Sequence, residues 1–347
     1  MKVVHVQKVS GISGSEAHLL SLLPRLRARG LDASMIVLHE GEPGAHAFVD
    51  AMRTHDVPVE AWRMRADVDP FVFAKLTRLK ADVVHTHLVH ADVHGLPAAA
   101  LARVPLRVST KHGFNDFRSN RAVASADRTA ARFAQRQIAI SSGLAQYLEQ
   151  TEGFAPGTFT VVHYGIEPGS EPPPPPEQPR LLAVGRLIPI KGFDVLLHAF
   201  ATAKKDVPEL MLEIAGDGPL ADRLRADAPD GVRFLGHVSP PGPLYEDAAI
   251  VVVPSRGEGF GMVALEAAER GRAAIASDVG GLPEIVDHDA TGLVVRPGDA
   301  DALAAAIVTL ARDPARTRTF GEAARARALS EFSADVAAER VEGVYRS

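Results

Sequence analysis

Two glutamates that stand eight residues apart around a glycine-rich stretch give the strongest chemical signal in the sequence. Glu258 and Glu266 bracket Gly259, Phe260 and Gly261, and an apolar run that predicts a helix follows the glycines directly. The first turn of a helix offers unpaired backbone N–H groups and the positive end of the helix dipole, which together bind anions. The stretch therefore predicts an anion site, with one carboxylate beside it and a second on the following helix.

Two cations follow the predicted strand at residues 181–184. Arg186 and Lys191 come shortly after this strand, and ligands of open α/β sheets bind at the carboxyl ends of the strands. Charge-assisted hydrogen bonds from such groups contribute roughly 1.5–3 kcal/mol each. We expect the pair to bind a diphosphate and to stabilise the charge on a leaving diphosphate, so that no metal is required. Two ordinary surface cations are the alternative.

Further motifs occur in order along the chain. They are Gly185-Arg186-Leu187 with Lys191-Gly192, Gly216-Asp217-Gly218-Pro219, Gly280-Gly281-Leu282-Pro283-Glu284 and Thr291-Gly292-Leu293. With the two glutamates, this series resembles the retaining glycosyltransferases of family 4 over nearly the whole chain. The resemblance implies the GT-B fold, which is two Rossmann-like α/β domains facing a cleft. It also implies transfer of a sugar from a nucleotide diphosphate to an acceptor hydroxyl, with retention of anomeric configuration.

The resemblance assigns a role to each residue of the glutamate stretch. Glu266 would accept the ribose hydroxyls of the nucleotide, and Glu258 would lie beneath the donor sugar and contact a ring hydroxyl. The N–H groups of Gly259, Phe260 and Gly261 would meet sugar hydroxyls and phosphate. Turn formation for Glu258 and a solvated helix face for Glu266 are the structural alternatives, and the spacing leaves open whether Glu258 acts as a covalent nucleophile.

Two positions in the first half extend the comparison. His112, in Lys111-His112-Gly113-Phe114 at the end of a predicted strand, resembles the family's histidine that reaches the donor sugar. A structural histidine is the alternative. Gly14 lies in the turn 11–16 after the first strand and would contact donor phosphate or acceptor, with Ser15 as the cap of the next helix. The family usually carries two adjacent glycines here and this sequence separates them, so an ordinary strand-to-helix turn is the alternative for Gly14.

Metal binding is a weaker interpretation of two other groups. Four histidines cross from a strand end into a helix, and two aspartates precede a proline; they are His85, His87, His90 and His94, and Asp67 and Asp69. A transition-metal site needs a fixed convergent ligand set, and an acidic residue before proline is typical of a helix cap. We therefore expect no metal and no cofactor beyond the nucleotide-sugar co-substrate.

Alternating β-branched and helical segments divide the chain into two similar halves. The predicted strands cover residues 3–6, 33–38, 82–85, 106–110, 137–140 and 159–162, and then 181–184, 210–214, 232–235, 250–253 and 273–276. This alternation predicts doubly wound, mostly parallel sheets. Five prolines at 172–176 favour an extended spacer. We predict an acceptor-binding domain at 1–166, a linker at 167–179 and a nucleotide-sugar-binding domain at 180–330; the resemblance implies that a helix at 331–347 packs back on the first domain.

Composition limits the remaining possibilities. The chain has 347 residues, of which 46% are hydrophobic and 23% charged, as in ordinary globular proteins. It has no cysteine, which excludes disulfides and thiolate chemistry and fits a cytoplasmic protein. Several arginines follow one another in the basic first half, namely Arg118, Arg121, Arg128, Arg132 and Arg136. They predict a solvated helix surface or a contact with an anionic or lipid-linked acceptor at the inner face of the membrane. The sequence pI of about 6.3 lies below neutrality, which argues against nucleic acid.

Two other functions stay open from the sequence. A sugar-nucleotide epimerase or hydrolase would use the same architecture, and so would a non-catalytic protein that binds sugar nucleotides. Intact Arg186, Lys191, Glu258 and Glu266 favour an enzyme. The sequence names neither the donor base nor the acceptor.

Overall fold

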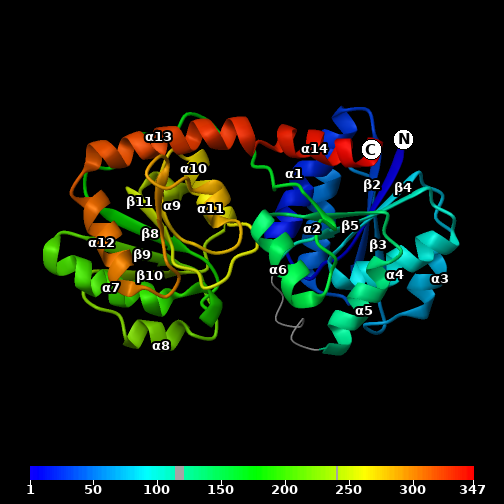
Figure 1. Cartoon of the computed structure of the whole chain (residues 1–347), viewed down its shortest axis with the longest axis horizontal. Helices are drawn as coiled ribbons and strands as arrows, with labels where there is room; N and C mark the ends of the chain where they lie inside the picture. The colour runs from blue at the N-terminus through cyan, green and yellow to red at the C-terminus, as the bar shows by residue number, and fades with distance from the viewer. Residues whose placement is uncertain (114–120, 240) are drawn as a thin grey trace. The chain divides into compact units, whose positions relative to one another are not determined.

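The chain folds into two compact units, each built around one parallel β-sheet (Figure 1). The computed structural model describes residues 1–113, 121–239 and 241–347. Met1–Glu167 and Ala334–Ser347 form the first unit, and Pro168–Ser333 form the second. Phe114 of the histidine motif, Arg118 and the side chain of Arg121 lie outside the described parts of the chain.

The sheet of the first unit has seven strands in the order β3-β2-β1-β4-β5-β6-β7, and all neighbours are parallel. The strands are β1 (Lys2–Lys8), β2 (Asp32–His39), β3 (Val59–Arg63), β4 (Val83–His87), β5 (Leu106–Lys111), β6 (Arg136–Ala139) and β7 (Phe159–Val161). The helices of this unit are α1 (Gly14–Ala28), α2 (Pro43–Thr54), α3 (Pro70–Leu76), α4 (Leu88–Leu101), α5 (Arg121–Ala131), α6 (Ser142–Glu152) and α14 (Ala334–Arg346). After β3 the chain returns to the middle of the sheet and adds β4 on the free side of β1, which makes the sheet doubly wound.

The second unit repeats this plan with six parallel strands in the order β10-β9-β8-β11-β12-β13. They are β8 (Arg180–Val184), β9 (Met211–Ala215), β10 (Val232–Gly236), β11 (Ile250–Val253), β12 (Ala273–Ser277) and β13 (Gly292–Val295). A 3-10 turn, η2 (Pro189–Lys191), precedes α7 (Phe193–Asp206). The other helices are α8 (Ala221–Ala226), α9 (Gly242–Glu246), α10 (Met262–Glu269), α11 (Leu282–Ile285), α12 (Ala300–Ala311) and α13 (Pro314–Glu331). The predicted pair of doubly wound α/β domains is confirmed.

Central strands are buried on both faces because helices cover both sides of each sheet. Every residue of β11 and of β12 is buried. In the first unit the two sides of the sheet carry separate apolar clusters, one under α1 and α2 and the other under α3 and α4. Short apolar runs without polar alternation in the sequence therefore mark the strands at the centre of the second sheet.

The C-terminal helix α14 belongs to the first unit. Val341, Val344 and Tyr345 join the apolar cluster that contains the leucines of α1. At the edge of this contact, Arg29 Nε donates to Glu342 Oε2 over 2.5 Å. The helix thus adds a buried face and an ion pair to α1.

The proline-rich stretch packs on the second unit. Gly169 N donates to Glu269 Oε1 over 2.8 Å, and Arg272 Nη2 donates to the carbonyl oxygen of Pro173 over 2.9 Å. The Arg272 side chain is almost fully buried. These bonds hold residues 169–173 against the second unit.

Among the described residues, no helix combines the length and the hydropathy that crossing a lipid bilayer requires.

Candidate functional site

Loops at the carboxyl ends of β8, β9 and β11 pack closely against one another in the second unit. A Cβ atom at Gly192 would lie 2.1 Å from the carbonyl oxygen of Pro254, and one at Gly216 would lie 1.9 Å from that of Gly185. Both Gly192 and Gly216 have a positive φ, of 68° and 148°. A side chain at either position would separate the loops, so these motif glycines fix the shape of the sheet edge.

The loop after β11 leads into the N-terminus of α10. Gly261 caps this helix with φ 116°, and a Cβ atom there would lie 2.6 Å from Leu282 Cδ2. Phe260 is buried beside Gly261. The first N–H groups of a helix have no partner within it, so Met262 and Val263 direct theirs toward this edge of the sheet. That this helix end binds an anion stays a prediction.

Lys191 and Glu258 form an ion pair across two of these loops. Lys191 Nζ lies 2.6 Å from Glu258 Oε2, and 23% and 16% of the two side chains are exposed. Ser255 Oγ donates to the same carboxylate oxygen over 3.3 Å. The sequence predicted separate partners for Lys191 and Glu258, whereas the structure joins them. A diphosphate that bound Lys191 would therefore compete with Glu258 for the ammonium.

Arg186 lies in the loop between β8 and η2, and its side chain is exposed. Among the described residues, its guanidinium makes no hydrogen bond or ion pair. By contrast, Arg256, on the neighbouring loop, is held by Asp194 through bonds of 2.8 and 2.7 Å. Arg186 is thus a cation at this sheet edge that a ligand could engage without first breaking a bond.

Glu266 lies in the second turn of α10 and is held by a tyrosine that the sequence analysis did not identify. Tyr245 in α9 donates from its hydroxyl to Glu266 Oε2 over 2.5 Å. Burial raises the pKa of Tyr245 well above its ordinary value, so the phenol keeps its proton. Burial also raises the pKa of Glu266, helped by the nearby Glu269 and opposed by the bond from Tyr245. Within the described parts of the chain, no hydrogen bond reaches Glu266 Oε1.

A hollow of about 360 Å³ lies between α7 and α8 on the same unit. Pro189 and Arg256 contribute to its wall. None of Arg186, Lys191, Glu258 and Glu266 lines it. The predicted residues therefore lie outside this hollow.

In the first unit, Gly14 is the first residue of α1, and Ser13 is its cap. Glu16 Oε2 accepts from the backbone N–H of Ser13 over 3.1 Å. The prediction of Ser15 as the cap is wrong, because Glu16 stands three residues after Ser13 and completes a capping box with it. Ser15 Oγ instead accepts from Gln7 Nε2 over 3.2 Å.

His112 follows β5 at the carboxyl edge of the first sheet and is half-buried. Its Nε2 lies 2.9 Å from His87 Nδ1, and its Nδ1 hydrogen-bonds the hydroxyl of Tyr164. Burial lowers the pKa of His112 well below its ordinary value, with contributions from His18 and Lys111, so the imidazole is neutral. Both ring nitrogens have protein partners, so a ring contact with a sugar hydroxyl would replace one of these bonds.

Lys111, the residue before His112, anchors the end of β5 through buried ion pairs. Lys111 Nζ lies 2.6 Å from Asp92 Oδ2 and 2.7 Å from Asp127 Oδ1, and none of the three side chains is exposed. Burial raises the pKa of Asp92, whereas Lys111 opposes the shift. This ion triad ties β5 to α4 and α5.

The four histidines weighed as metal ligands do not converge. His94 Nε2 accepts from the backbone N–H of Asp69 over 2.9 Å, and His90 Nε2 lies 3.3 Å from Asp67 Oδ1. Asp69 caps α3 by accepting from the N–H groups of Phe71 and Val72, which confirms its predicted role.

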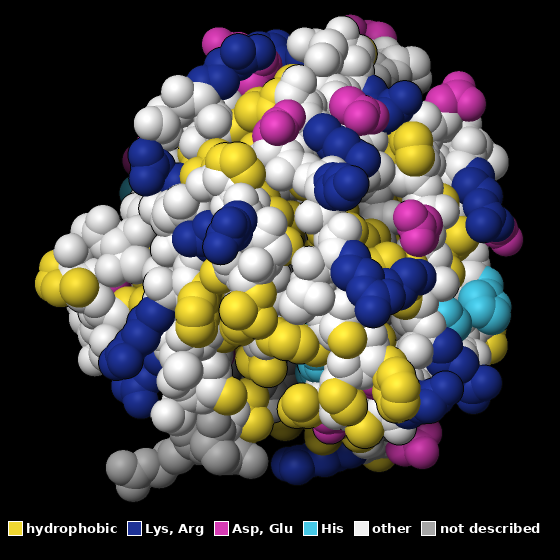
Figure 2. Space-filling model, turned by 90° about the vertical axis from the view of Figure 1, so that its right-hand side faces the viewer, with side chains coloured by type: hydrophobic (Ala, Val, Ile, Leu, Met, Phe, Trp, Pro, Cys, Tyr) yellow, Lys and Arg dark blue, Asp and Glu magenta, His cyan; other side chains and the backbone are white. Residues whose placement is uncertain are grey.

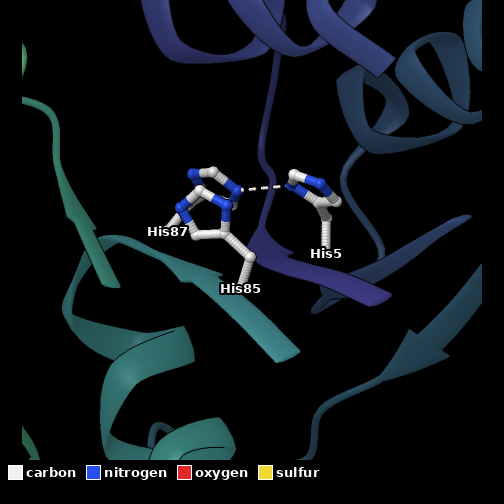
Figure 3. A group of neighbouring side chains, drawn as sticks. All are labelled: His5, His85 and His87. Atoms are coloured by element: carbon white, nitrogen blue, oxygen red, sulfur yellow. Dashed lines mark hydrogen bonds between the residues drawn. The ribbon is translucent and has the colours of Figure 1, made fainter. Parts of the chain in front are cut away.

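His85 and His87 instead meet a third histidine, His5 of β1, which the sequence analysis did not identify (Figure 3). One nitrogen from each ring falls within 4.8 Å of the other two, and the described residues hold no other group with metal-ligand spacing. The nitrogens of His5 and His87 are hydrogen-bonded to each other over 2.9 Å. That no metal is required remains a prediction.

The arginines of the first half differ in their bonding partners and in their exposure. Arg25 pairs with Glu167, and Arg128 donates to the carbonyl oxygen of Glu152 over 2.9 Å. Arg132 is exposed, and Arg136 donates to the carbonyl oxygen of Gln135. On the face in Figure 2, Lys and Arg side chains are dispersed among acidic and apolar ones. The described arginines therefore form no single basic field on that face.

A solved structure matches the fold from end to end. This is Anabaena Alr3699/HepE in complex with UDP and glucose, which aligns with a TM-score of 0.85 over 100% of this chain and 99% of that chain at 22% identity. The fold is that of the GT-B class of glycosyltransferases.

Comparison of the sequence identifies the family within that class. Residues 12–170 match Glycosyltransferase Family 4, and residues 178–313 match Glycosyl transferases group 1. The chain therefore belongs to the family 4 glycosyltransferases, as the motif series predicted. Alpha-maltose-1-phosphate synthase of Mycolicibacterium smegmatis is 32% identical over 79% of this chain and 84% of the relative. D-inositol 3-phosphate glycosyltransferase of Kribbella flavida is 31% identical over 77% of this chain and 71% of the relative.

Proposed function

We propose that this glycosyltransferase moves a hexose from a nucleotide-diphosphate sugar to an acceptor hydroxyl with retention of anomeric configuration. The observation that carries the proposal is the sheet edge of the second unit. There Lys191 and Glu258 are paired at 2.6 Å beside the N-terminus of α10, and Glu266 stands in the second turn of that helix. In the proposal, the cation and the helix N–H groups bind the diphosphate, and the carboxylates accept hydrogen bonds from hydroxyl groups.

Each of these groups has a distinct task in the proposal. Arg186 and Lys191 bind the diphosphate, and the N–H groups of Gly259, Phe260 and Gly261 meet phosphate and sugar hydroxyls. Glu266 accepts the ribose hydroxyls through Oε1, since Tyr245 already donates to Oε2. Glu258 contacts a ring hydroxyl of the sugar. In the first unit, His112 reaches the sugar and Gly14 contacts the phosphate or the acceptor.

Retention follows because the acceptor oxygen attacks the anomeric carbon from the same face that the leaving phosphate departs from. The bond from the anomeric carbon to the β-phosphate oxygen breaks as the bond to the acceptor oxygen forms, and the acceptor proton passes to the departing phosphate. Arg186 and Lys191 stabilise the negative charge that grows on that phosphate. In this scheme neither a metal nor a separate strong base is required.

The donor and acceptor classes draw on the relatives. One structural neighbour was solved with UDP and glucose, and a relative is named for inositol 3-phosphate. We infer a uridine or guanosine diphosphate sugar as donor, and an anionic or lipid-linked acceptor that binds the first unit. Cell-surface glycan, glycolipid or metabolite glycosylation would suit such acceptors. In the proposal the protein works in the cytoplasm, where the first unit could touch the inner face of the membrane.

Incubation with nucleotide sugars tests the proposed reaction. With uridine and guanosine diphosphate sugars alone, a transferase should release little free sugar and form no epimer. A panel of phosphorylated polyols and lipid-linked sugars should then yield a product whose new linkage keeps the donor's anomeric configuration by NMR. An inverted linkage would contradict retention, and conversion without acceptor would indicate the epimerase or hydrolase. Tight donor binding with no turnover across the panel would indicate a sugar-nucleotide-binding protein.

A further inference from the structure

A continuous hydrogen-bonded row of side chains runs inward from His112 through the first sheet. His112 Nε2 lies 2.9 Å from His87 Nδ1, and His87 Nε2 lies 2.9 Å from His5 Nδ1. Figure 3 shows the last of these bonds, between rings on the neighbouring strands β1 and β4. The planes of these two rings differ by 8°. At its outer end, His112 Nδ1 is bonded to the hydroxyl of Tyr164.

The row continues to the C-terminal helix. The hydroxyl of Tyr345, on α14, lies 3.3 Å from His5 Nε2 and 2.6 Å from His85 Nδ1. His85 Nε2 then lies 2.6 Å from Thr110 Oγ1. His5, His85 and His87 are at most 1% exposed, and Tyr345 is 6% exposed. Tyr345 is therefore the link by which α14 enters the row.

Proton counting restricts this row to two arrangements. Burial lowers the pKa of His5 to about 3 and those of His85 and His87 well below the ordinary value, so each ring is neutral. A neutral imidazole has one N–H donor and one acceptor nitrogen, and a phenol can donate one bond and accept another. The Tyr345 hydroxyl is buried, so we take it to donate its proton within the row. If Tyr164 then donates to His112 Nδ1, every later bond points inward to Thr110. If Thr110 donates to His85 Nε2 instead, every bond points outward.

These two arrangements give His112 opposite tautomers. With the bonds pointing inward, the proton of His112 is on Nε2; with the bonds pointing outward, it is on Nδ1. A donor left facing a donor, or an acceptor facing an acceptor, would leave a buried polar group without a partner, at a cost of about 1–3 kcal/mol. The tautomer of His112 is therefore tied to the orientation of the Tyr345 hydroxyl.

We infer that His5, His87, His85 and Tyr345 are positioning residues that fix the tautomer and ring orientation of His112 from the C-terminal helix. Its consequence for catalysis rests on the proposed contact of His112 with the donor sugar. Docking of α14 then supplies the hydroxyl that completes the row, although α14 follows the second unit in sequence. A transition metal held by His5, His85 and His87 is the competing arrangement, and it would have to break the 2.9 Å bond between His5 and His87.

Two variants of α14 separate this positioning role from simple helix docking. Tyr345→Phe removes the hydroxyl in the middle of the row and keeps the aromatic packing. Glu342→Gln weakens the bond of α14 to Arg29 and leaves the row untouched, so it is the matched control. In ¹⁵N-labelled full-length protein, long-range ¹⁵N–¹H spectra of the imidazoles report which nitrogen of each ring is protonated.

In the native protein we expect one neutral tautomer for His112. The nitrogen of His112 that carries the proton shows which of the two arrangements is present. Tyr345→Phe should shift the ring resonances of His87 and His112, or produce a mixture of tautomers, whereas Glu342→Gln should leave them unchanged. Unchanged His112 resonances in Tyr345→Phe would overturn the inference. The inference would also be overturned if the native protein bound stoichiometric metal and the Tyr345→Phe variant retained it.

Kinetics with the native donor connect the row to function. Tyr345→Phe should lower kcat/KM for the donor about fivefold or more, the effect of one lost hydrogen bond, and Glu342→Gln should change it less than about twofold. Equal effects of the two variants would contradict a positioning role and leave only helix docking. The imidazole spectra do not depend on turnover, so they decide the inference even if the proposed reaction is wrong.

If Tyr345→Phe fails to fold, His87→Gln offers a second test. It interrupts the row one bond from His112 and should change the tautomer of His112 in the same spectra. An unchanged tautomer there would overturn the inference too.

Discussion

Replacing Glu258 by glutamine tests how the ion pair of the second unit is used. The Lys191 ammonium donates to Glu258 Oε2 over 2.6 Å, and both side chains are largely shielded from water. A diphosphate must take over or share that ammonium. A charge-assisted hydrogen bond contributes about 1.5–3 kcal/mol and is roughly twice as strong as a neutral one. Glu258→Gln should therefore remove about 1 kcal/mol of competition for Lys191.

The expected result is opposite for the two partners of the pair. By titration calorimetry, Glu258→Gln should bind uridine or guanosine diphosphate about fivefold more tightly, whereas Lys191→Ala should bind it more than about tenfold less tightly. The double variant should lose the gain, because it has no ammonium to release. Sugar transfer by Glu258→Gln should fall even so, since the proposed contact with the sugar is weakened.

A matched control shows whether a glutamate-to-glutamine change at this exposure has a general effect. Glu213 in β9 is also 16% exposed and pairs with an arginine, Arg233, at 3.5 Å. Glu213→Gln should leave nucleotide affinity unchanged. If Glu258→Gln binds the diphosphate no better than the native protein while Lys191→Ala binds it worse, competition for Lys191 is refuted.

Three further variants test other parts of the account. Arg186→Ala should weaken nucleoside diphosphate binding by about 1.5–3 kcal/mol in calorimetry with the fold intact, whereas Arg223→Ala, which removes an exposed arginine of α8, should not; equal affinities for the two would remove Arg186 from the site. Lys111→Met should lower the free energy of unfolding in urea by about 3–5 kcal/mol, because it removes the buried cation that pairs with Asp92 and Asp127. A loss of less than about 1 kcal/mol would contradict this role of Lys111. Because burial raises the pKa of Glu266, ionising it costs the folded state stability above the ordinary glutamate pKa. Glu266→Gln should therefore be at least as stable as the native protein at pH 7, with a difference that shrinks as the pH falls toward the ordinary glutamate pKa of about 4.5 and is lost below it; a difference that grows in acid would show the opposite sign.

The sequence predicted every central strand of the two sheets, but only two of the four edge strands, β7 and β10. Buried runs such as 250–253 and 273–276 have no polar alternation and were identified. The edge strands β3 and β13 were missed. In β3 only Trp62 is buried, and in β13 only Gly292 and Leu293 are buried. Edge strands pair on one side only, so their residues need not form a long apolar run.

The site shows a similar limit. Glu258, Glu266 and the loop glycines could be identified because chain neighbours form the motif. Tyr245 and His5 could not, because Tyr245 lies 21 residues from Glu266 and His5 lies 82 residues from His87. Their roles come from strand order and helix packing, which no short spacing encodes. The pairing of β1 with β4, for example, is what brings His5 beside His87.

The most direct test of the central claim is a crystal structure of the protein with uridine or guanosine diphosphate bound. We expect the diphosphate within hydrogen-bond distance of Lys191 and of the first N–H groups of α10, with the ribose hydroxyls on Glu266 Oε1. A nucleotide bound in the hollow between α7 and α8, or anywhere else away from this sheet edge, would contradict it.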